Sequence, residues 1–230
     1  MEQKKFMKAV TFSYDDGVVY DKPLIDIFNA YGMKASFNLN SGLFKGASPW
    51  EYKAAKVWRP EPFNPALYKD HEVLFHGSMH AWPTKLSSEE LEAEFRDDIE
   101  ALEKMFGRKI EGGAYAYGDY NDKVEGYLKS LGVKYCRTTK VTHDFTPVKD
   151  LLAYEATCHH SDEKLFSLID EFLSIEEPKT PQIFYIWGHS YEFAGNGNWD
   201  LMEKACALLS GKEDVLYGTN TEVFRYFGMI

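Results

Sequence analysis

The chain has 230 residues, of which 44% are hydrophobic and 27% are charged, a composition typical of a globular protein. This length predicts a single domain over residues 1–230, with a core large enough to fold without disulfide bonds. The net charge of −10 argues against a nucleic-acid partner, because phosphate backbones are bound by positively charged surfaces.

Short strand-like runs alternate along the chain with longer runs of helical periodicity. In chain order, the predicted elements are strand 8–13, helix 22–31, strand 34–39, strand 72–75, helix 87–106, strand 113–117, helix 122–131, strand 134–138, strand 151–156, helix 163–173, strand 183–187, helix 199–209, strand 215–217 and helix 221–227. Such alternation predicts a mostly parallel sheet with helices outside it. Seven or eight units favour a compact or incomplete (β/α) barrel, and an open doubly wound sheet is the alternative.

The segment 40–70 interrupts this alternation with several prolines and large aromatic residues. A long irregular segment in a compact domain is often the lid or wall of a functional groove. It can equally be a packed excursion that covers one end of the barrel, and both interpretations stay open.

Acidic residues follow the first predicted strand, at Asp15 and Asp16, with Gly17 after them. Ligand sites in parallel α/β folds lie at the carboxyl ends of strands. Two adjacent carboxylates repel each other, so a positive group is expected nearby. The alternative is a loop in which aspartate caps the next helix.

Histidines follow two further predicted strands. His76 and His80 come directly after strand 72–75, and they can face one point if the backbone turns helically there. Two imidazoles and one carboxylate form a familiar metal-binding set with open positions for water and substrate. His189 follows the apolar strand 183–187, where an imidazole suits proton transfer. The alternative is that these are ordinary surface or core histidines.

These motifs resemble those of the polysaccharide deacetylases of carbohydrate esterase family 4. The Thr-Phe-Asp-Asp-Gly motif of that family corresponds to residues 11–17, with two additional residues before the aspartates. Its His-[Ser/Thr]-x-x-His motif corresponds to residues 76–80, with Gly77 in place of the hydroxyl residue. Its Arg-x-Pro-[Tyr/Phe]-Gly motif corresponds to residues 114–118 in a degraded form, and its last histidine to His189. The resemblance covers residues 8–227.

The resemblance implies a distorted (β/α) barrel with about seven parallel strands. It implies a divalent metal ion, zinc first and otherwise cobalt, nickel, manganese or iron, because each suits two imidazoles and a carboxylate. The residues that it implies as metal ligands are Asp16, His76 and His80. Asp15 would be the general base, Tyr117 would offer its backbone N–H to the oxyanion, and His189 would be the general acid.

Two side chains that support the catalytic residues in the family, an arginine and an aspartate, have no counterpart in the motifs of this chain. The third-motif arginine is missing, since Gly113 and Ala114 stand in its neighbourhood. We predict that Arg137, near the end of strand 134–138, reaches in and makes a bidentate pair with Asp15. A surface arginine on a solvated loop is the alternative. No aspartate corresponds to the usual partner of His189.

Aromatic residues make up 16% of the chain, and most of them are expected in the core. The candidates for packing against flat sugar faces are Trp82, Trp187 and Tyr191.

The expected function is removal of N- or O-acetyl groups from an acetylated sugar or small glycan. The alternatives are an amidohydrolase that acts on a non-sugar C–N bond and a non-catalytic sugar- or metal-binding relative. Asp15 speaks against the last, because a binder needs no free carboxylate beside the metal ligands. The sequence does not determine the oligomeric state.

The expected location is the cytoplasm. No apolar stretch is long enough for a signal peptide or a membrane helix, so no membrane association is expected. Cys136, Cys158 and Cys206 are odd in number and widely spaced, which fits neither a disulfide framework nor a CxxC metal site.

Overall fold

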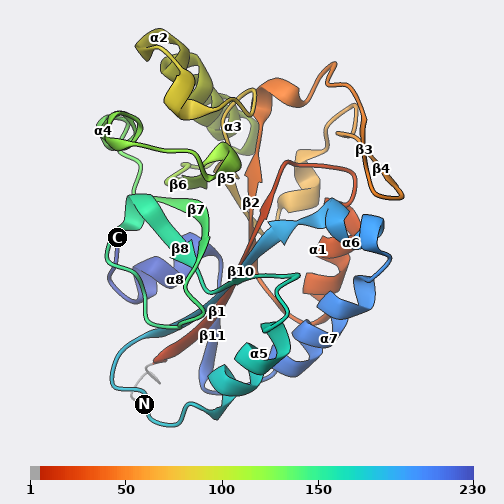
Figure 1. Ribbon diagram of the computed structural model, residues 1–230, viewed down its shortest axis with the longest axis vertical. Helices are drawn as coiled ribbons and strands as arrows, with labels where there is room; N and C mark the ends of the chain where they lie inside the picture. The colour runs from red at the N-terminus through yellow and green to blue at the C-terminus, as the bar shows by residue number, and fades with distance from the viewer. Residues whose placement is uncertain (1–5) are drawn as a thin grey trace.

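A parallel sheet forms the centre of the fold in the computed structural model, which describes residues 6–230 (Figure 1). Its strands are β1 (Lys8–Asp15), β2 (Ala35–Leu39), β5 (Glu72–Phe75), β6 (Gly112–Ala114), β7 (Tyr135–Val141), β8 (Tyr154–Ala156), β9 (Cys158–His159), β10 (Gln182–His189) and β11 (Val215–Tyr217). The hydrogen-bonded order is β8-β7-β6-β5-β2-β1-β10-β9, and β11 pairs with the first half of β1. All of these pairings are parallel.

A single short segment closes the sheet into a barrel. β8 pairs with β7 and β9 pairs with β10, and only Thr157 separates β8 from β9 along the chain. The Thr157 N–H donates to the carbonyl of Tyr185 on β10, at 2.9 Å. The hydrogen-bonded order contains eight strands. If β8 and β9 are counted as one interrupted strand, the barrel has seven. The predicted distorted (β/α) barrel with about seven parallel strands is therefore confirmed, and the open doubly wound alternative is wrong.

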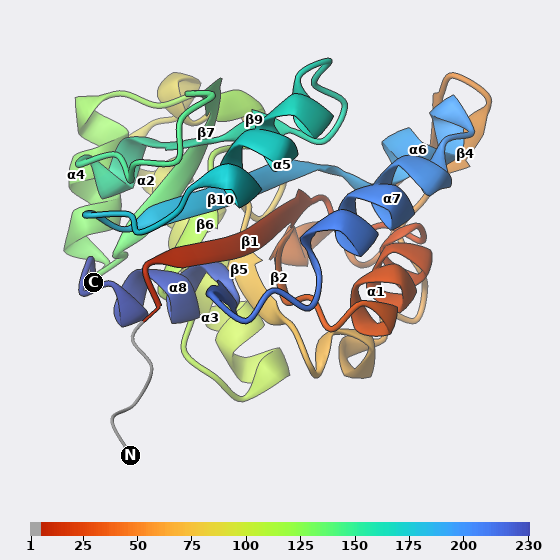
Figure 2. The same ribbon diagram turned by 90° about the horizontal axis from the view of Figure 1, so that it is seen from below.

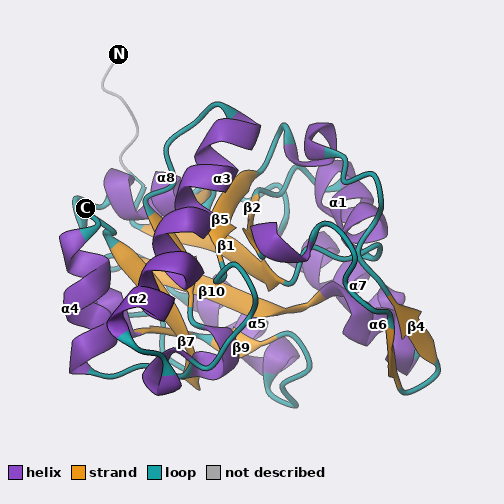
Figure 3. Ribbon diagram, turned by 90° about the horizontal axis from the view of Figure 1, so that it is seen from above, coloured by secondary structure: helices purple, strands orange, loops and turns teal. Residues whose placement is uncertain are grey.

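Helices surround this barrel (Figure 3). They are α1 (Asp21–Ala30), α2 (Ser88–Leu91), α3 (Asp97–Phe106), α4 (Asp122–Ser130), α5 (Leu165–Ser174), α6 (Ser190–Asn196), α7 (Trp199–Leu209) and α8 (Asn220–Tyr226). Figure 2 shows α1, α7 and α5 in succession along one side of β1 and β10. None of the helices in residues 6–230 has the length and apolar character that crossing a membrane requires.

The strand residues alternate between two apolar regions, because successive side chains of a strand point to opposite faces. Val10 and Phe12 of β1 belong to the larger region, between the sheet and the outer helices. Ala9 belongs to a smaller region inside the barrel, with Val223 and Phe224 of α8 at one end. Toward the other end of the barrel, buried polar and charged residues that include Ser13, Asp15 and Arg137 form the site described below.

Three of the departures from the predicted elements affect the site. The predicted strand 113–117 ends at Ala114, because the backbone turns at Tyr117. The predicted helix 87–106 begins with the expected capping box at Ser87, but a π turn over Glu92–Arg96 separates α2 from α3. Helix α6 was not predicted.

The segment 40–70 contains an antiparallel hairpin of β3 (Trp50–Tyr52) and β4 (Ala55–Val57), which packs against α6. Both interpretations of this segment hold in part. Val57 and Tyr68 are buried, as in a packed excursion, whereas Trp50 lines the hollow of the site.

Candidate active site

Side chains on or just after four strands of the barrel converge on one point. Asp15 ends β1, His189 ends β10, and the two are direct partners in the parallel register. Arg137 lies on β7 and His76 follows β5. Parallel strands bring their carboxyl ends to one edge of the barrel, so residues more than 170 positions apart meet there.

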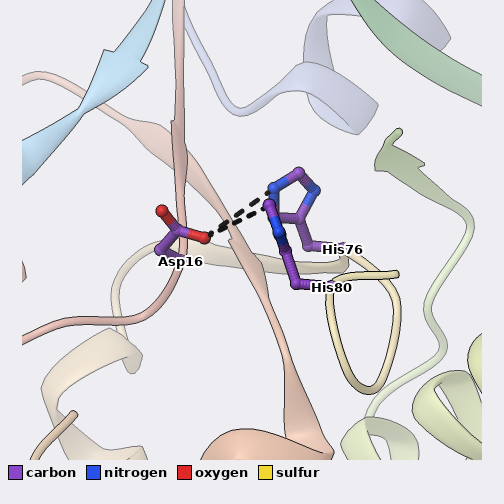
Figure 4. A group of neighbouring side chains, drawn as sticks. All are labelled: Asp16, His76 and His80. Atoms are coloured by element: carbon purple, nitrogen blue, oxygen red, sulfur yellow. Dashed lines mark ion pairs between the residues drawn. The ribbon is translucent and has the colours of Figure 1, made fainter. Parts of the chain in front are cut away.

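Asp16, His76 and His80 form a group that is suited to hold a metal ion (Figure 4). Oδ1 of Asp16 lies 3.6 Å from Nε2 of His80 and 4.0 Å from Nε2 of His76. Tetrahedral zinc ligands at 2.0–2.2 Å from the ion lie about 3.4 Å from one another, so this group needs only a small contraction. The donor set of two imidazoles and one carboxylate therefore fits a divalent cation.

The two imidazoles are prepared for this role in different ways. Nδ1 of His76 lies 2.8 Å from the carbonyl oxygen of Ala114, which holds the tautomer that leaves Nε2 free for a metal. Burial, with His76 nearby, lowers the pKa of His80 to about 4. Neutral imidazole is the form that binds metal ions.

The loop after β5, over residues 76–82, contains no helical turn, and Glu94 shapes it instead. Oε2 and Oε1 of Glu94 accept the N–H groups of Met79 and Ala81, at 3.0 and 2.8 Å. Gly77 has φ of 79°, and a Cβ there would lie 2.3 Å from Oε1 of Glu94. This crowding explains why glycine replaces the hydroxyl residue of the family motif. The π turn brings Glu94 into the loop, and such turns are frequent at functional sites.

Three site residues adopt the left-handed backbone region. Asp16, His80 and Tyr117 have φ of 85°, 55° and 60°. They are half of the six non-glycine residues with positive φ in the described chain. This conformation costs about 1–3 kcal/mol per residue and clusters at functional sites. The ring of Tyr117 lies 4.4 Å from that of His80 between centroids, so Tyr117 borders the metal group.

Arg137 is fully buried and lies against Asp15, so the surface-arginine alternative is wrong. Nη2 donates to both carboxylate oxygens, at 2.7 and 2.5 Å, while Nη1 donates to the carbonyl of Thr138 at 2.8 Å. The contact differs from the expected bidentate fork, since one nitrogen serves both oxygens. Asn38 also donates to Asp15, at 2.7 Å. Burial alone would raise the pKa of Asp15, but Arg137, with His76 and His189, holds it well below its usual range.

Trp187 does not fit the predicted sugar contact. It is 7% exposed, and the guanidinium carbon of Arg137 lies 4.3 Å from its ring centroid. The strand register turns the indole into the barrel, so it supports Arg137 instead.

His189 has an acidic partner that the sequence analysis missed. Its Nε2 lies 3.9 Å from Oδ2 of Asp15, and its Nδ1 lies 3.4 Å from Oε1 of Glu192 on α6. Burial would lower the pKa of His189, but Glu192 and the site aspartates raise it to about 9. The three-residue spacing from His189 to Glu192 was a usable signal, because such residues share one face when a helix begins there.

A hollow of about 360 Å³ opens over the metal group. Its lining residues are Asp16, Leu43, Trp50, Arg59, Met79, His80, Tyr117 and Tyr191. Tyr191 is thus at the wall of this hollow, and Trp82, 43% exposed, stacks on Tyr117 at 4.1 Å between ring centroids. A larger hollow of about 710 Å³ between α1 and α7 is lined by no histidine or cysteine of the described chain.

Arg59, which lines the hollow over the metal group, is a second residue that the sequence analysis missed. Its Nε donates to the carbonyl of Asp16 at 3.1 Å, and its Nη2 lies 3.7 Å from Oδ1 of that residue. The irregular segment that carries Arg59 offers no periodicity that could have placed it. Arg59 and Arg137 thus supply the positive charge that the adjacent aspartates require.

Comparison with known proteins identifies the family to which these motifs belong. The family model described as polysaccharide deacetylase matches residues 2–136, which is more than half of the chain. The match includes Asp15, Asp16, His76 and His80, and it ends one residue before Arg137. No curated protein matches the chain.

Several solved structures share the fold. The peptidoglycan deacetylase PdaC from Bacillus subtilis is 16% identical with a TM-score of 0.57, over 97% of this chain and 93% of that one. The Xyl-CE4 domain of a multidomain xylanase, from the hindgut metagenome of Trinervitermes trinervoides, is 14% identical with a TM-score of 0.57, over 96% and 91%. A CE4 family pseudoenzyme from Bacillus anthracis is 18% identical with a TM-score of 0.55, over 96% and 66%, so this chain spans about two thirds of its length.

Proposed function

The chain belongs to the polysaccharide deacetylase family, carbohydrate esterase family 4, and on that basis we propose that it is a metal-dependent deacetylase that removes an N- or O-acetyl group from a sugar or small glycan. One observation carries the proposal. Asp15 is held as a carboxylate by Arg137, and its Oδ2 lies 3.8 Å from Nε2 of His76 and 3.9 Å from Nε2 of His189. A base, a metal ligand and a charged acid thus face one another across the space where an acetyl group would react.

In this proposal, Asp16, His76 and His80 hold the cation. When bound, a divalent cation lowers the pKa of water toward about 7 and polarises the acetyl carbonyl. Asp15 takes the proton of the attacking water. The backbone N–H of Tyr117 stabilises the oxyanion, a contribution of about 3–4 kcal/mol per donor in comparable sites.

His189 acts from the other side of Asp15. An amine is a poor leaving group unless it is protonated. Glu192 keeps His189 in the charged form that can donate this proton. For an O-acetyl group, the same proton goes to the departing alkoxide oxygen.

Zinc is the cation that we propose first. Cobalt, nickel, manganese and iron suit the same two imidazoles and carboxylate, so the donor set does not select among them.

A relative of similar fold is described as a pseudoenzyme, and a mutant of that protein is described as having restored activity. The corresponding question for this chain is whether the missing third-motif arginine abolishes catalysis. Arg137 favours activity, because it places a guanidinium on Asp15 from β7, the strand that pairs with β6 beside the third motif.

The hollow favours a sugar over a small non-sugar amide. Trp50, Tyr117 and Tyr191 line it, and Trp82 extends the aromatic surface outward beside Tyr117. Flat aromatic faces suit the apolar faces of sugar rings.

The test is acetate release by the zinc-loaded protein from N-acetylglucosamine oligomers, acetylated xylan and simple amides. We expect release from a glycan, abolished by chelation and restored by zinc. Release from simple amides alone would replace the glycan proposal with the amidohydrolase one. No release from any substrate by fully loaded protein would refute the enzymatic proposal.

A further inference from the structure

Glu192 lies at the centre of a second group of histidines, on the side of His189 that faces away from Asp15. Its Oε2 lies 3.1 Å from Nε2 of His159 and 3.1 Å from Nε2 of His160. Its Oε1 lies 3.4 Å from Nδ1 of His189. His159 ends β9, His189 ends β10 and Glu192 lies on α6, so this group is assembled at the same edge of the barrel as the active site.

These close contacts do not have the alignment of hydrogen bonds. Nε2 of His160, Nδ1 of His189 and Oε2 of Glu192 are all buried, and none has a hydrogen-bond partner among residues 6–230. Buried polar atoms are normally paired, since leaving one unpaired costs about 1–3 kcal/mol. Nitrogen and oxygen atoms that are near each other but not aimed at each other are typical of ligands whose lone pairs share a third point.

We propose that His159, His189 and Glu192 form a second divalent-cation site. One ligand atom from each lies within 4.8 Å of the others. Glu192 contacts His159 through Oε2, at 3.1 Å, and His189 through Oε1, at 3.4 Å, so the carboxylate lies between the two imidazoles and can turn one oxygen toward an ion that both bind. Two imidazoles and a carboxylate are also the donor set of the first site, so a cation that suits one suits the other.

The surroundings support the same ligand set. His160 is fully buried between Tyr14 and Phe193, and it contacts the Glu192 carboxylate as an orienting neighbour. Nδ1 of His159 lies 2.7 Å from the hydroxyl oxygen of Ser161. A proton donated from Nδ1 to that oxygen leaves Nε2 free for the ion. The Ser161 N–H donates to the same Nδ1 at 3.2 Å, which favours the tautomer with the proton on Nε2. In this proposal, cation binding at Nε2 moves that proton to Nδ1, where it is donated to the Ser161 hydroxyl oxygen.

The site shares His189 with the proposed acid, and this consequence rests on the proposed function. A cation on Nδ1 excludes the doubly protonated imidazole from which Nε2 would give its proton. Occupancy of the second site therefore inhibits deacetylation, while occupancy of the first enables it.

Zinc alone is the probe. The full chain is dialysed against increasing zinc, and bound zinc is counted by elemental analysis. We expect two ions per chain in the wild type, one in His159→Ala, one in His80→Ala and none in the double variant. Glu192→Gln should also bind one ion, because it replaces a carboxylate ligand of the second site with a neutral amide. His143→Ala, a half-exposed histidine paired with Asp162, is the control and should bind two.

One zinc ion in both the wild type and His159→Ala would overturn the second site, whether or not the protein is active. The inhibitory role has a separate readout. Wild-type acetate release should rise with the first equivalent of zinc and fall at excess, whereas His159→Ala should reach a plateau. Two bound ions with no decline at excess zinc would refute inhibition and retain the site.

Discussion

Arg137 donates from Nη2 to both carboxylate oxygens of Asp15, at 2.7 and 2.5 Å, although the two residues are 122 positions apart in the chain. Both side chains are buried, at 1% and 3% exposure. A buried pair of this kind cannot lose one partner without leaving an uncompensated charge. The pair therefore connects the proposed base to the stability of the barrel.

The first prediction follows from this pair. Arg137→Gln removes the charge that depresses the pKa of Asp15, so that pKa should rise by about 1–3 units. Asp15 must be ionised to act as base, and the acidic limb of the pH–rate profile should move to higher pH by the same amount. Arg137→Lys keeps the charge but loses the Nη1 contact with Thr138. Turnover should therefore fall, while the acidic limb moves less than in Arg137→Gln. Metal content should not change in either variant.

Arg225→Gln is the matched control, because Arg225 pairs with Glu111 at the surface. An unshifted acidic limb in Arg137→Gln would remove Arg137 from the proposed site. The depressed pKa of Asp15 also makes the free energy of unfolding depend on pH. A depressed carboxyl pKa adds stability above the unfolded value near 3.9, and that stability is lost as the pH falls through the folded value.

The second prediction concerns the metal ligands. His80→Ala should lose the first-site metal and nearly all acetate release, while the melting temperature of the metal-free protein stays close to that of the wild type. The reason is that His80 lies on a loop outside both apolar regions. His143→Ala is a close control, since His143 shares the left-handed backbone, with φ of 53° against 55° for His80. Full occupancy of the first site in His80→Ala would contradict the ligand assignment.

The third prediction separates the two aspartates. Asp15→Asn has almost the same shape but cannot accept a proton at neutral pH, so it should keep its metal and lose about 10²–10⁴-fold in rate. Asp16→Asn should lose metal as well as rate. The measurement is metal content beside acetate release for both variants. Loss of metal in Asp15→Asn with retention in Asp16→Asn would mean that the two roles are reversed.

The fourth prediction concerns Glu192 as the partner of His189. Glu192→Gln removes the carboxylate that raises the pKa of His189 to about 9, so the basic limb of the pH–rate profile should move to lower pH. Only one equivalent of metal should be present, to leave the second site empty. A raised histidine pKa adds stability below the unfolded value near 6.5, and this is lost as the pH rises through about 9. Exposed Glu203→Gln is the control, and equal basic limbs in the two variants would dismiss Glu192 as the partner.

The fifth prediction tests the loop after β5. Glu94→Gln keeps one acceptor oxygen and loses the other, so the N–H group of Met79 or Ala81 is left without its partner. We expect metal affinity at the first site to fall by about 10–100-fold, the usual effect of losing a contact behind a metal ligand. Glu92→Gln, on the exposed side of the same π turn, should bind metal as the wild type does. Titration of metal into the two variants measures the difference, and equal affinities would refute the role of Glu94.

The strand pattern and the motifs could be read from the sequence alone. Alternation along β1 already assigns Ser13 and Asp15 to one face, and alternation along β7 assigns Tyr135 and Arg137 to one face, because side-chain direction in a strand has a period of two. The clustering of Asp15, Asp16, His76, His80 and His189 at strand ends is likewise a local property of the chain, as is the family resemblance that those residues carry.

Only the tertiary structure decided which of these faces meet. β7 and β1 are not neighbours in the sheet, so the contact of Arg137 with Asp15 depends on the curvature of the barrel. Glu94 reaches the metal loop through a π turn, and Arg59 reaches Asp16 from an irregular segment, and neither feature has a periodic signature. The burial of Trp187 was likewise decided by the tertiary structure. A strand residue at the rim can face a ligand or another side chain, and the choice depends on what the opposite strand places there, here the guanidinium of Arg137.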